Sequence, residues 1–463
     1  MSSTTTTPPA GINKLYFAVW RWHFYAGLYV LPFLIMLAVT GIVMVWFTAI
    51  APEYGERLAV TPQTQSLGIT DQASAALATH PAGKIGQYIA PHDAQTPAIF
   101  RVDLADGQRM IAVDPYSGAV LRDTQNGATW YTLANEVHGT LLIGTLGDRL
   151  VEIAASLGLL LVITGLYLVW PRNGSGLRAL LLPDLRTKGR AWWKAMHSVM
   201  GFWISLGLVF FLISGLAWSG IWGEKYVQAW ATFPAAKWDN VPLSDKRHKD
   251  MNMTADDTVP WGLEQTPMPM SGSDMGVTGL PMGVPVSLEN IVALGRAIGF
   301  QGRFQVALPA DEAGVWTLSQ DSNSYDGPDP TADRTVHIDQ FTGKILAQVG
   351  FADYGLAAKS MAVGIALHEG QLGLWNVVLN IGFCLIVVFV CVSGVVMWWK
   401  RRPSGAFRLA APPMPIGVPL RGIAVIALLL GVAFPMLGLT LIAVLLLDFL
   451  VLQNVPAMKR AFS

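Results

Sequence analysis

The sequence predicts an α-helical integral membrane protein in which a helix, an external α+β domain and a second helix follow one another twice. Hydrophobic residues make up 52% of its 463 residues and charged residues only 13%, a composition too apolar for a soluble protein of this size. Several apolar runs exceed the 18 or so residues of a membrane-spanning helix. A histidine with glycine four residues later and a hydroxyl–glycine pair 17 and 18 residues later occurs twice, at His23 and at His197.

The distribution of charge predicts the orientation of the helices. Residues 171–194 hold six basic residues and one acidic residue, and residues 400–421 hold five basic residues and no acidic one. The two long polar segments, 51–137 and 223–367, are net acidic. By the positive-inside rule, the basic loops and the N-terminus are cytoplasmic and the long segments lie outside.

The first half contains one external domain between two spanning helices. In that domain we expect a helix at Ile69–Ala78 and strands at Ile85–Ile89, Ile99–Leu104, Arg109–Val113 and Ala119–Arg122, because turn residues separate short β-prone runs. One helix and a small antiparallel sheet fit this pattern. The expected segments are a disordered tail (1–12), a spanning helix (13–50), the external domain (51–130), and a boundary turn with a second spanning helix (131–171).

The second half repeats this order. Asp339–Leu346 aligns with Asp114–Leu121 without a gap, so we interpret the chain as a duplication. The C-terminal apolar run is interrupted at Phe434-Pro435, which favours a helical hairpin and leaves one kinked helix as the alternative. The expected segments are a basic loop (172–190), a spanning helix (191–222), a Met/Pro/Gly-rich insertion (223–285), a second external domain (286–360), a boundary turn with a fourth spanning helix (361–400), a basic loop (401–415), the hairpin (416–453) and a cytoplasmic tail (454–463).

Four histidines occupy matched positions in the two halves. The topology puts His23 and His197 on the cytoplasmic side and His138 and His368 on the external side. A pseudo-two-fold arrangement would make each pair face across an axis, as a bis-histidine haem requires. His23 and His197 each lie in the first spanning helix of their half. Eighteen residues make five helical turns and four residues make about one, so the glycines at these spacings, including Gly27 and Gly201, lie on the same helix face as the histidine. We therefore expect two haem b groups, about 20 Å apart across a core of roughly 30 Å.

Other interpretations of these histidines stay open at this point. Interfacial residues satisfied by headgroups, a proton relay or a non-haem metal site are the alternatives. If haem is bound, Arg21, Lys194 and Arg149 are candidate partners for its propionates. The remaining histidines are expected at the surface, because no spacing among them makes a metal site; they are His80, His92, His248 and His337.

Several other features carry weaker signals. Residues 245–285 combine His248 with Met-x-Met pairs, which could bind Cu(I), although a contact surface or linker is the preferred interpretation. The acidic stretch Asp321–Asp333 lacks the glycine and the closing glutamate of a calcium loop, so we expect a solvated hairpin loop. Cys384 and Cys391 are expected to be small core residues. No dinucleotide fingerprint, phosphate loop or nucleophile motif is present, so we assign no catalytic residue.

Together these motifs resemble the PepSY-associated transmembrane family of bacterial iron-regulated membrane proteins. The resemblance spans nearly the whole chain and rests on His23-x3-Gly27 with Thr40-Gly41, His197-x3-Gly201 with Ser214-Gly215, His138-Gly139, His368-Glu369-Gly370, the turns Asp114–Gly118 and Asp339–Gly343, Trp261–Gln265, and Phe434–Gly438 with Asp448. The resemblance implies an inner-membrane protein with periplasmic PepSY-like domains and haem on His23, His197, His138 and His368.

The resemblance also implies an activity. Some family members are di-haem reductases of ferric siderophores at the periplasmic face. The expected partners are then a ferric siderophore or another metal chelate, a cytoplasmic reductase or quinol as electron donor, and the bilayer, but no nucleic acid. The long Met-rich segment departs from the first half and leaves the substrate open. The alternatives are a non-enzymatic PepSY module that binds or regulates a periplasmic protease, and a copper-handling membrane protein.

Overall fold

The computed structural model describes residues 14–172, 176–239, 241–251, 259–321, 324, 326–402, 409–412, 417–418, 420–452 and 454–455. The expected N-terminal tail, Met253 of the Met-rich segment, most of the second basic loop and residues 456–463 lie outside these ranges. The contacts divide the chain into two compact units. The helical unit comprises Met1–Val39, Gly139–Lys225 and Gly382–Ser463, and the sheet unit comprises Thr40–His138 and Tyr226–Ile381.

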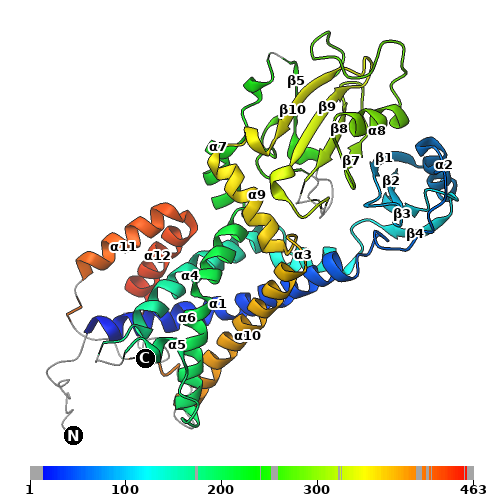
Figure 1. The fold of residues 1–463 in the computed structure, drawn as a ribbon. Helices are drawn as coiled ribbons and strands as arrows, with labels where there is room; N and C mark the ends of the chain where they lie inside the picture. The colour runs from blue at the N-terminus through cyan, green and yellow to red at the C-terminus, as the bar shows by residue number, and fades with distance from the viewer. Residues whose placement is uncertain are drawn as a thin grey trace, which may run out of the picture. The chain divides into compact units, whose positions relative to one another are not determined.

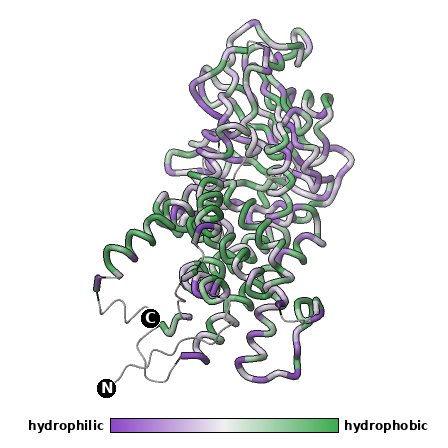
Figure 2. The backbone as a smooth tube through the Cα atoms, turned by 90° about the vertical axis from the view of Figure 1, so that its left-hand side faces the viewer, coloured by the Kyte–Doolittle hydropathy of each residue, from purple (hydrophilic) through white to green (hydrophobic). Residues whose placement is uncertain are grey.

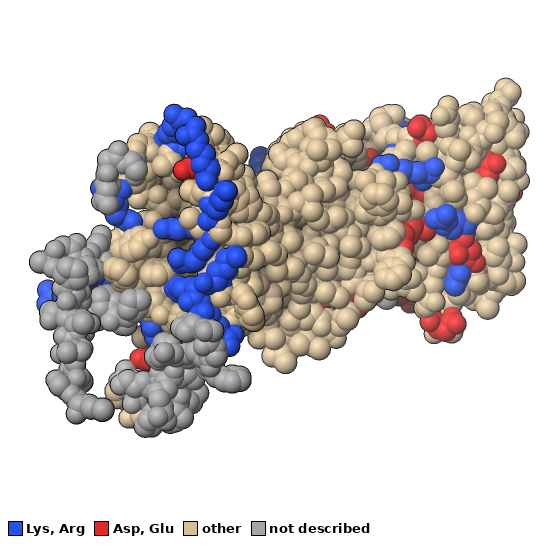
Figure 3. Space-filling model, turned by 90° about the horizontal axis from the view of Figure 1, so that it is seen from below, with Lys and Arg blue, Asp and Glu red and all other residues tan. Residues whose placement is uncertain are grey.

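Four described helices are long and apolar enough to cross a membrane, and they stand out as hydrophobic stretches in Figure 2. They are α1 (Lys14–Val45, extended by a π-helical turn, η1, Trp46–Ile50), α4 (Thr145–Val169), α6 (Arg190–Leu216) and α10 (Leu374–Arg401). The connections that follow α4 and α10 are rich in Lys and Arg. Figure 3 shows Lys and Arg gathered over part of the surface with few Asp or Glu among them.

Small residues let the helices of the helical unit pack closely. Gly158 of α4 lies against Leu212 of α6, where an added Cβ would meet the leucine side chain at 3.0 Å. Ala38 of α1 shares a buried apolar cluster with Ile204 of α6 and with Cys391 of α10. Cys391 is therefore a core residue, as the sequence predicted, and neither cysteine forms a disulfide.

Two short apolar helices follow in the C-terminal segment, α11 (Leu420–Ala433) and α12 (Pro435–Leu447), with a π-helical turn at Asp448–Leu452. They turn at Phe434 and approach closely through two glycines, since a Cβ on Gly431 would lie 3.0 Å from the Cα of Gly438. At 1.5 Å per residue α11 is about 21 Å long, which is shorter than a hydrocarbon core of roughly 30 Å.

The sheet unit corrects the fold class, because it contains an eight-stranded antiparallel sheet and the protein is of mixed class. The order of the strands is β10-β9-β8-β7-β1-β2-β3-β4, as Figure 1 shows. The first half supplies α2 (Ile69–Thr79), β1 (Lys84–Ile89), β2 (Ala98–Leu104), β3 (Gly107–Val113) and β4 (Val120–Gln125). The second half supplies α8 (Leu288–Ala297), β7 (Gln305–Ala307), β8 (Val315–Gln320), β9 (Arg334–Asp339) and β10 (Ile345–Gly350).

The eight-stranded sheet arises because two four-stranded halves join at their edges. β1 pairs with β7 in antiparallel register, with Tyr88 opposite Val306. Residues from α2 and α8 share one buried core with the strands, including Phe100 and Phe304. The sequence predicted two separate small sheets and missed this joining, which covers an edge strand of each half that would otherwise present unpaired backbone groups.

Two further helices of the sheet unit carry candidate histidines, α3 (Trp130–Thr140) and α9 (Leu356–Glu369). The expected break between His138 and the second spanning helix is present, since Gly144 has a φ of 59° before α4 begins. The corresponding break after α9 falls at Gly370 and Gly373, whose φ values are 84° and 97°.

The remaining elements of the sheet unit are short. β5 (Leu243–Arg247) and β6 (Pro267–Pro269) form a separate two-stranded sheet. Short helical turns lie at Gln228–Ala231, Ala235–Lys237, His248–Met251, Pro330–Ala332 and Phe351–Asp353. The turn at Trp222–Val227 crosses from the helical unit into the sheet unit, and α5 (Arg178–Leu181) belongs to the helical unit.

The prediction of a solvated acidic loop at Asp321–Asp333 was wrong. Asp321, Asp326 and Asp333 are all buried. Arg303 lies before β7 and donates from Nε to Asp326 Oδ1 at 3.2 Å. The acidic residues therefore face inward because a buried guanidinium pairs with one of them, a tertiary contact that the loop composition does not reveal.

Candidate functional site

The helical unit brings His23 of α1 and His197 of α6 next to each other. Their ring centroids lie 6.5 Å apart and their ring planes are at 90°. The pairing of these two matched histidines is the geometry that the sequence permitted but did not establish. Both imidazoles keep part of their surface open.

Hydroxyl groups on neighbouring helices fix the orientation of both rings. His23 Nδ1 lies 3.0 Å from Thr164 Oγ1 of α4, and His197 Nδ1 lies 2.8 Å from Ser393 Oγ of α10. Each hydroxyl donates its own proton to a carbonyl of its helix, to Leu160 for Thr164 and to Val390 for Ser393. Each oxygen therefore accepts from an Nδ1–H, which leaves the lone pair of Nε2 available as a ligand.

The separation of the rings fits one metal ion held between two imidazoles. A bond from a transition metal to an imidazole nitrogen is about 2 Å, and the ring centroid lies about 1.2 Å beyond the nitrogen. Two imidazoles on opposite sides of one ion therefore have centroids about 6.4 Å apart, close to the observed 6.5 Å. Hydrogen bonding of the non-ligating nitrogen is also typical of metal-bound histidine.

The glycines near this pair leave room beside the rings. A Cβ on Gly201 would meet nothing within 4 Å, and one on Gly27 would meet only Leu161 at 3.9 Å. Gly165 and Gly394 follow the hydroxyl residues and let the histidines lie close, since a Cβ would stand 3.2 Å from His23 Cε1 and 3.7 Å from His197 Cε1. A flat macrocycle needs such space around its axial ligands.

The sheet unit holds the second pair, His138 on α3 and His368 on α9. His138 Nδ1 lies 2.8 Å from Thr40 Oγ1, so a hydroxyl orients this ring as well. Burial lowers the pKa of His138 to about 4. Burial, with a smaller contribution from His138, lowers the pKa of His368 to about 3. Both rings are therefore neutral near pH 7, as iron ligation requires.

Two asparagines that the sequence analysis missed fix the end of α9. Asn380 Nδ2 donates to the carbonyls of His368 at 2.8 Å and Leu367 at 3.0 Å. Asn376 Nδ2 donates to Leu367 O at 2.9 Å and to Asn380 Oδ1 at 3.1 Å. The sequence did contain a signal for these two residues, because two asparagines four residues apart stand at the start of an apolar helix. A buried amide must find hydrogen-bond partners.

The expected propionate partners do not all remain free for that role. Arg149 was expected to be available, but its Nη1 bonds to Asp148 Oδ2 at 2.6 Å and to Glu152 Oε2 at 3.1 Å. Arg21 donates to Pro412 O at 2.7 Å, and Lys194 is exposed. Asp148 and Glu152 of its own helix already pair with Arg149, so its guanidinium is less available to a propionate than the sequence suggests.

Arg401 is a basic residue that the sequence analysis did not single out. Its guanidinium lies 5.0 Å from the ring centroid of Trp20 and 5.4 Å from that of Phe24. Phe24 directly follows His23 in α1, so Arg401 brings positive charge to the surroundings of the first histidine pair.

The prediction that His248 and His337 are surface residues was wrong. Both are fully buried, and their Nε2 atoms lie 2.9 Å apart. His248 Nδ1 pairs with Thr266 O at 2.7 Å and His337 Nδ1 with Thr317 Oγ1 at 3.0 Å, so every ring nitrogen has a partner. Residues 89 positions apart in sequence meet only through the tertiary fold. His92 is exposed and His80 is partly exposed, pairing with Asp123.

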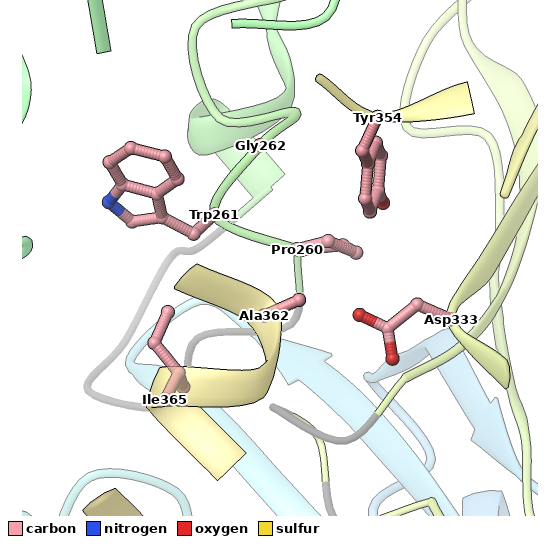
Figure 4. Close-up of a pocket in the computed structure, with 7 residues that line it drawn as sticks. All are labelled: Pro260, Trp261, Gly262, Asp333, Tyr354, Ala362 and Ile365. Carbon is pink, nitrogen blue, oxygen red and sulfur yellow. The ribbon is translucent and has the colours of Figure 1, made fainter. Parts of the chain in front are cut away.

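One small cavity lies beside α9 in the sheet unit. Pro260, Trp261, Asp333, Tyr354 and Ile365 contribute to its lining, and Figure 4 shows the Tyr354 hydroxyl and the Asp333 carboxylate turned toward the same space. Its volume of about 10 Å³ holds about one water molecule. Small-molecule sites usually need several hundred Å³, so this cavity is too small for a metal chelate.

Within the described ranges, no group of three or more His, Cys, Asp or Glu is placed to hold a metal ion. A bare ion between His23 and His197 would therefore lack further protein ligands of these types. A haem iron needs only two axial ligands, because the porphyrin supplies the other four. The donor set fits haem better than it fits a non-haem metal.

A family model described as the PepSY-associated TM region matches residues 20–401. The chain belongs to this family. The match includes all four candidate histidines, and together with the four long apolar helices it makes the chain a multi-pass membrane protein. Among curated proteins, the search finds no significant match.

Proposed function

We propose that this PepSY-associated membrane protein is a di-haem b-type electron-transfer protein that reduces ferric siderophores, or similar metal chelates, at the periplasmic face of the bacterial inner membrane. The observation that carries the proposal is the His23–His197 pair. Its centroid separation of 6.5 Å and its free Nε2 lone pairs match the axial ligation of one haem iron.

The second haem of the proposal lies between His138 and His368. Its support is the burial of both rings, which keeps them neutral, the Thr40 hydroxyl on His138, and the matched position of both residues in the two halves of the sequence. The duplication and the C-terminal hairpin belong to the same proposal, as do the cytoplasmic N-terminus and the periplasmic sheet unit, which follow from the positive-inside rule.

Bound haem supplies a one-electron carrier in a medium of low dielectric constant. The protein's own groups hold the axial imidazoles in one tautomer, through Thr164, Ser393 and Thr40. Gly27 and Gly201 leave space for a ring, and the apolar helices exclude water. These residues bind and orient the carrier, and the dielectric around it sets its potential.

The reaction transfers one electron to each ferric ion. Reduction of Fe(III) to Fe(II) weakens its binding to hard oxygen donors, so a siderophore releases the metal. The sequence has no dinucleotide fingerprint, and therefore the electron comes from a separate cytoplasmic reductase or from membrane quinol.

The test is a reconstitution in lipid vesicles with haem supplied during expression. Purified protein should show a haem Soret band, reduction by a quinol or a reductase, and re-oxidation by an added ferric siderophore in proportion to the Fe(II) formed. If the protein binds haem but no ferric chelate re-oxidises it, the proposed substrate is wrong. If the protein shows no Soret band, the proposal of a haem protein is wrong.

The copper-handling alternative requires His248 as a ligand beside the Met-x-Met pairs. Both ring nitrogens of His248 already form hydrogen bonds inside the sheet unit, so this side chain is not available to copper. The non-enzymatic alternative, in which the sheet unit binds or regulates a periplasmic protease, predicts that function survives replacement of the four histidines. Replacement of the four histidines therefore distinguishes the electron-transfer function from the non-enzymatic one.

A further inference from the structure

The connection between α4 and α6 combines exposed leucines with basic residues. Leu177, Leu182 and Leu185 are 63%, 59% and 67% exposed. Around them stand five exposed basic residues, Arg172, Arg178, Arg186, Lys188 and Arg190. Asp184 is the one acidic residue of the described part of this connection, and its Oδ1 accepts from the backbone N–H of Arg186 at 3.0 Å.

This connection is held against the transmembrane helices. Leu180 of α5 is buried at 3% exposure, and Trp203 Nε1 donates to Leu181 O at 3.0 Å. Trp203 lies thirteen residues after the start of α6, so the bond brings α5 back alongside the helix. The exposed leucines therefore lie beside a membrane-spanning helix.

We propose that residues 176–190 lie in the lipid headgroup layer, where Leu177, Leu182 and Leu185 enter the acyl region and the basic side chains bind the phosphates of anionic lipids. Apolar side chains beside clustered Lys and Arg are the pattern of interfacial segments. Free phosphate would use the charges but leave the leucines in water, at a cost that grows with their exposed area. Continuity with α4 and α6 on both sides favours lipid over a soluble protein partner.

The depth of the leucines tests the insertion. Full-length protein with Cys384 and Cys391 changed to Ala would carry one spin label, at Leu182→Cys or Leu185→Cys, in nanodiscs that contain anionic lipid. The matched control is Asp106→Cys in the turn between β2 and β3, which is exposed. We expect the labels at 182 and 185 to favour collisions with oxygen and the label at 106 to favour collisions with a water-soluble nickel chelate.

The charge tests the lipid class. Lys188→Gln with Arg190→Gln should weaken phosphatidylglycerol binding by about fivefold per residue removed, measured against phosphatidylcholine in mixed nanodiscs. Arg57→Gln with Lys84→Gln, both exposed in the sheet unit, should leave binding unchanged, and millimolar inorganic phosphate should not displace the lipid. The proposal is overturned if the label at 182 behaves like the one at 106, if the two double variants bind phosphatidylglycerol equally, or if phosphate displaces the lipid.

Discussion

His23 and His197 present their imidazole rings to each other across 6.5 Å with the ring planes perpendicular. The Nδ1 atom of His23 donates a hydrogen bond to the hydroxyl of Thr164, and that of His197 donates one to the hydroxyl of Ser393. The two rings do not hydrogen-bond to each other through these nitrogens, and their Nε2 atoms remain open for the axial ligation that we propose. The buried His248–His337 pair shows the contrast, because there the Nε2 atoms bond directly at 2.9 Å.

A side chain at Gly201 should exclude haem without disturbing the fold. Nothing lies within 4 Å of a Cβ built on Gly201, so the Gly201→Leu variant should fold. Its leucine side chain should fill the space beside His197. We expect loss of about one haem per chain by pyridine haemochrome assay. Gly382→Leu is the matched control, since Gly382 is also open within 4 Å, and it should keep the full haem content; equal haem in both variants would contradict the assigned cradle.

Removing the hydroxyls should change the metal site rather than the fold. Thr164→Val removes the acceptor of His23 Nδ1, and Ser393→Ala removes the nearer of two acceptors of His197 Nδ1, the other being Val390 O at 3.0 Å. Loss of such a partner typically weakens metal affinity by about 10–100-fold. We expect a shifted midpoint potential in a redox titration, with recovery in Thr164→Ser and Ser393→Thr. Thr440→Val removes a hydroxyl that donates to Met436 O of its own helix, and a comparable shift in this variant would argue against a positioning role.

The buried histidine pair should make the sheet unit sensitive to acid. Burial lowers the pKa of His248 to about 4 and that of His337 well below its ordinary value. Because the unfolded chain then binds protons more readily, stability should be constant above pH 6.5 or so and fall between about 6.5 and 4, by about 3 kcal/mol for His248 alone. Thermal unfolding across this range checks the slope.

A double variant isolates the source of that acid sensitivity. His248→Gln with His337→Gln should flatten the slope between pH 6.5 and 4, since glutamine does not titrate in this range. His80→Gln, at a partly exposed position, should keep it. An unchanged slope in the double variant would assign the acid sensitivity to other groups.

The two aligned turns should differ in their contribution to stability. Asp339 is fully buried and accepts from the N–H groups of Gly272, Phe341 and Thr342 at 2.7–2.8 Å. These bonds outweigh the opposing effect of burial and hold the pKa of Asp339 below its ordinary value. Asp339→Ala should therefore cost roughly 3 kcal/mol in unfolding free energy, whereas Asp114→Ala at the less buried turn should cost less; the reverse order would contradict this.

Local structure in the external domains could be predicted from the sequence, because β-prone runs between turn residues mark each strand. The strand predicted at Ile99–Leu104, for example, is observed at Ala98–Leu104. The pairing of β1 with β7 could not be predicted, since edge-to-edge joining depends on the register and orientation of segments about 200 residues apart. The same holds for the burial of His248, His337 and the acidic residues beside Arg303.

For the candidate site too, the sequence predicts some residues and not their contacts. The repeat identified the four histidines and two glycines, and family membership is confirmed by the match over residues 20–401. From the sequence, only the glycines of these motifs were placed on the face of the histidine, and the hydroxyl residues were given no role. In the structure, the hydroxyl residues Thr164, Ser393 and Thr40 bond to histidines of other helices, because helix packing brings them there and periodicity describes only one helix at a time.

The most direct test of the account is the haem count per chain, by reduced-minus-oxidised spectra and pyridine haemochrome, in the wild type and in four single variants: His23→Ala, His197→Ala, His138→Ala and His368→Ala. We expect two haems in the wild type and one in every variant, with the same spectral component lost from His23→Ala and His197→Ala and the other component lost from the remaining two. A wild type without haem, or variants that keep both haems, would contradict the assignment of these four histidines as ligands.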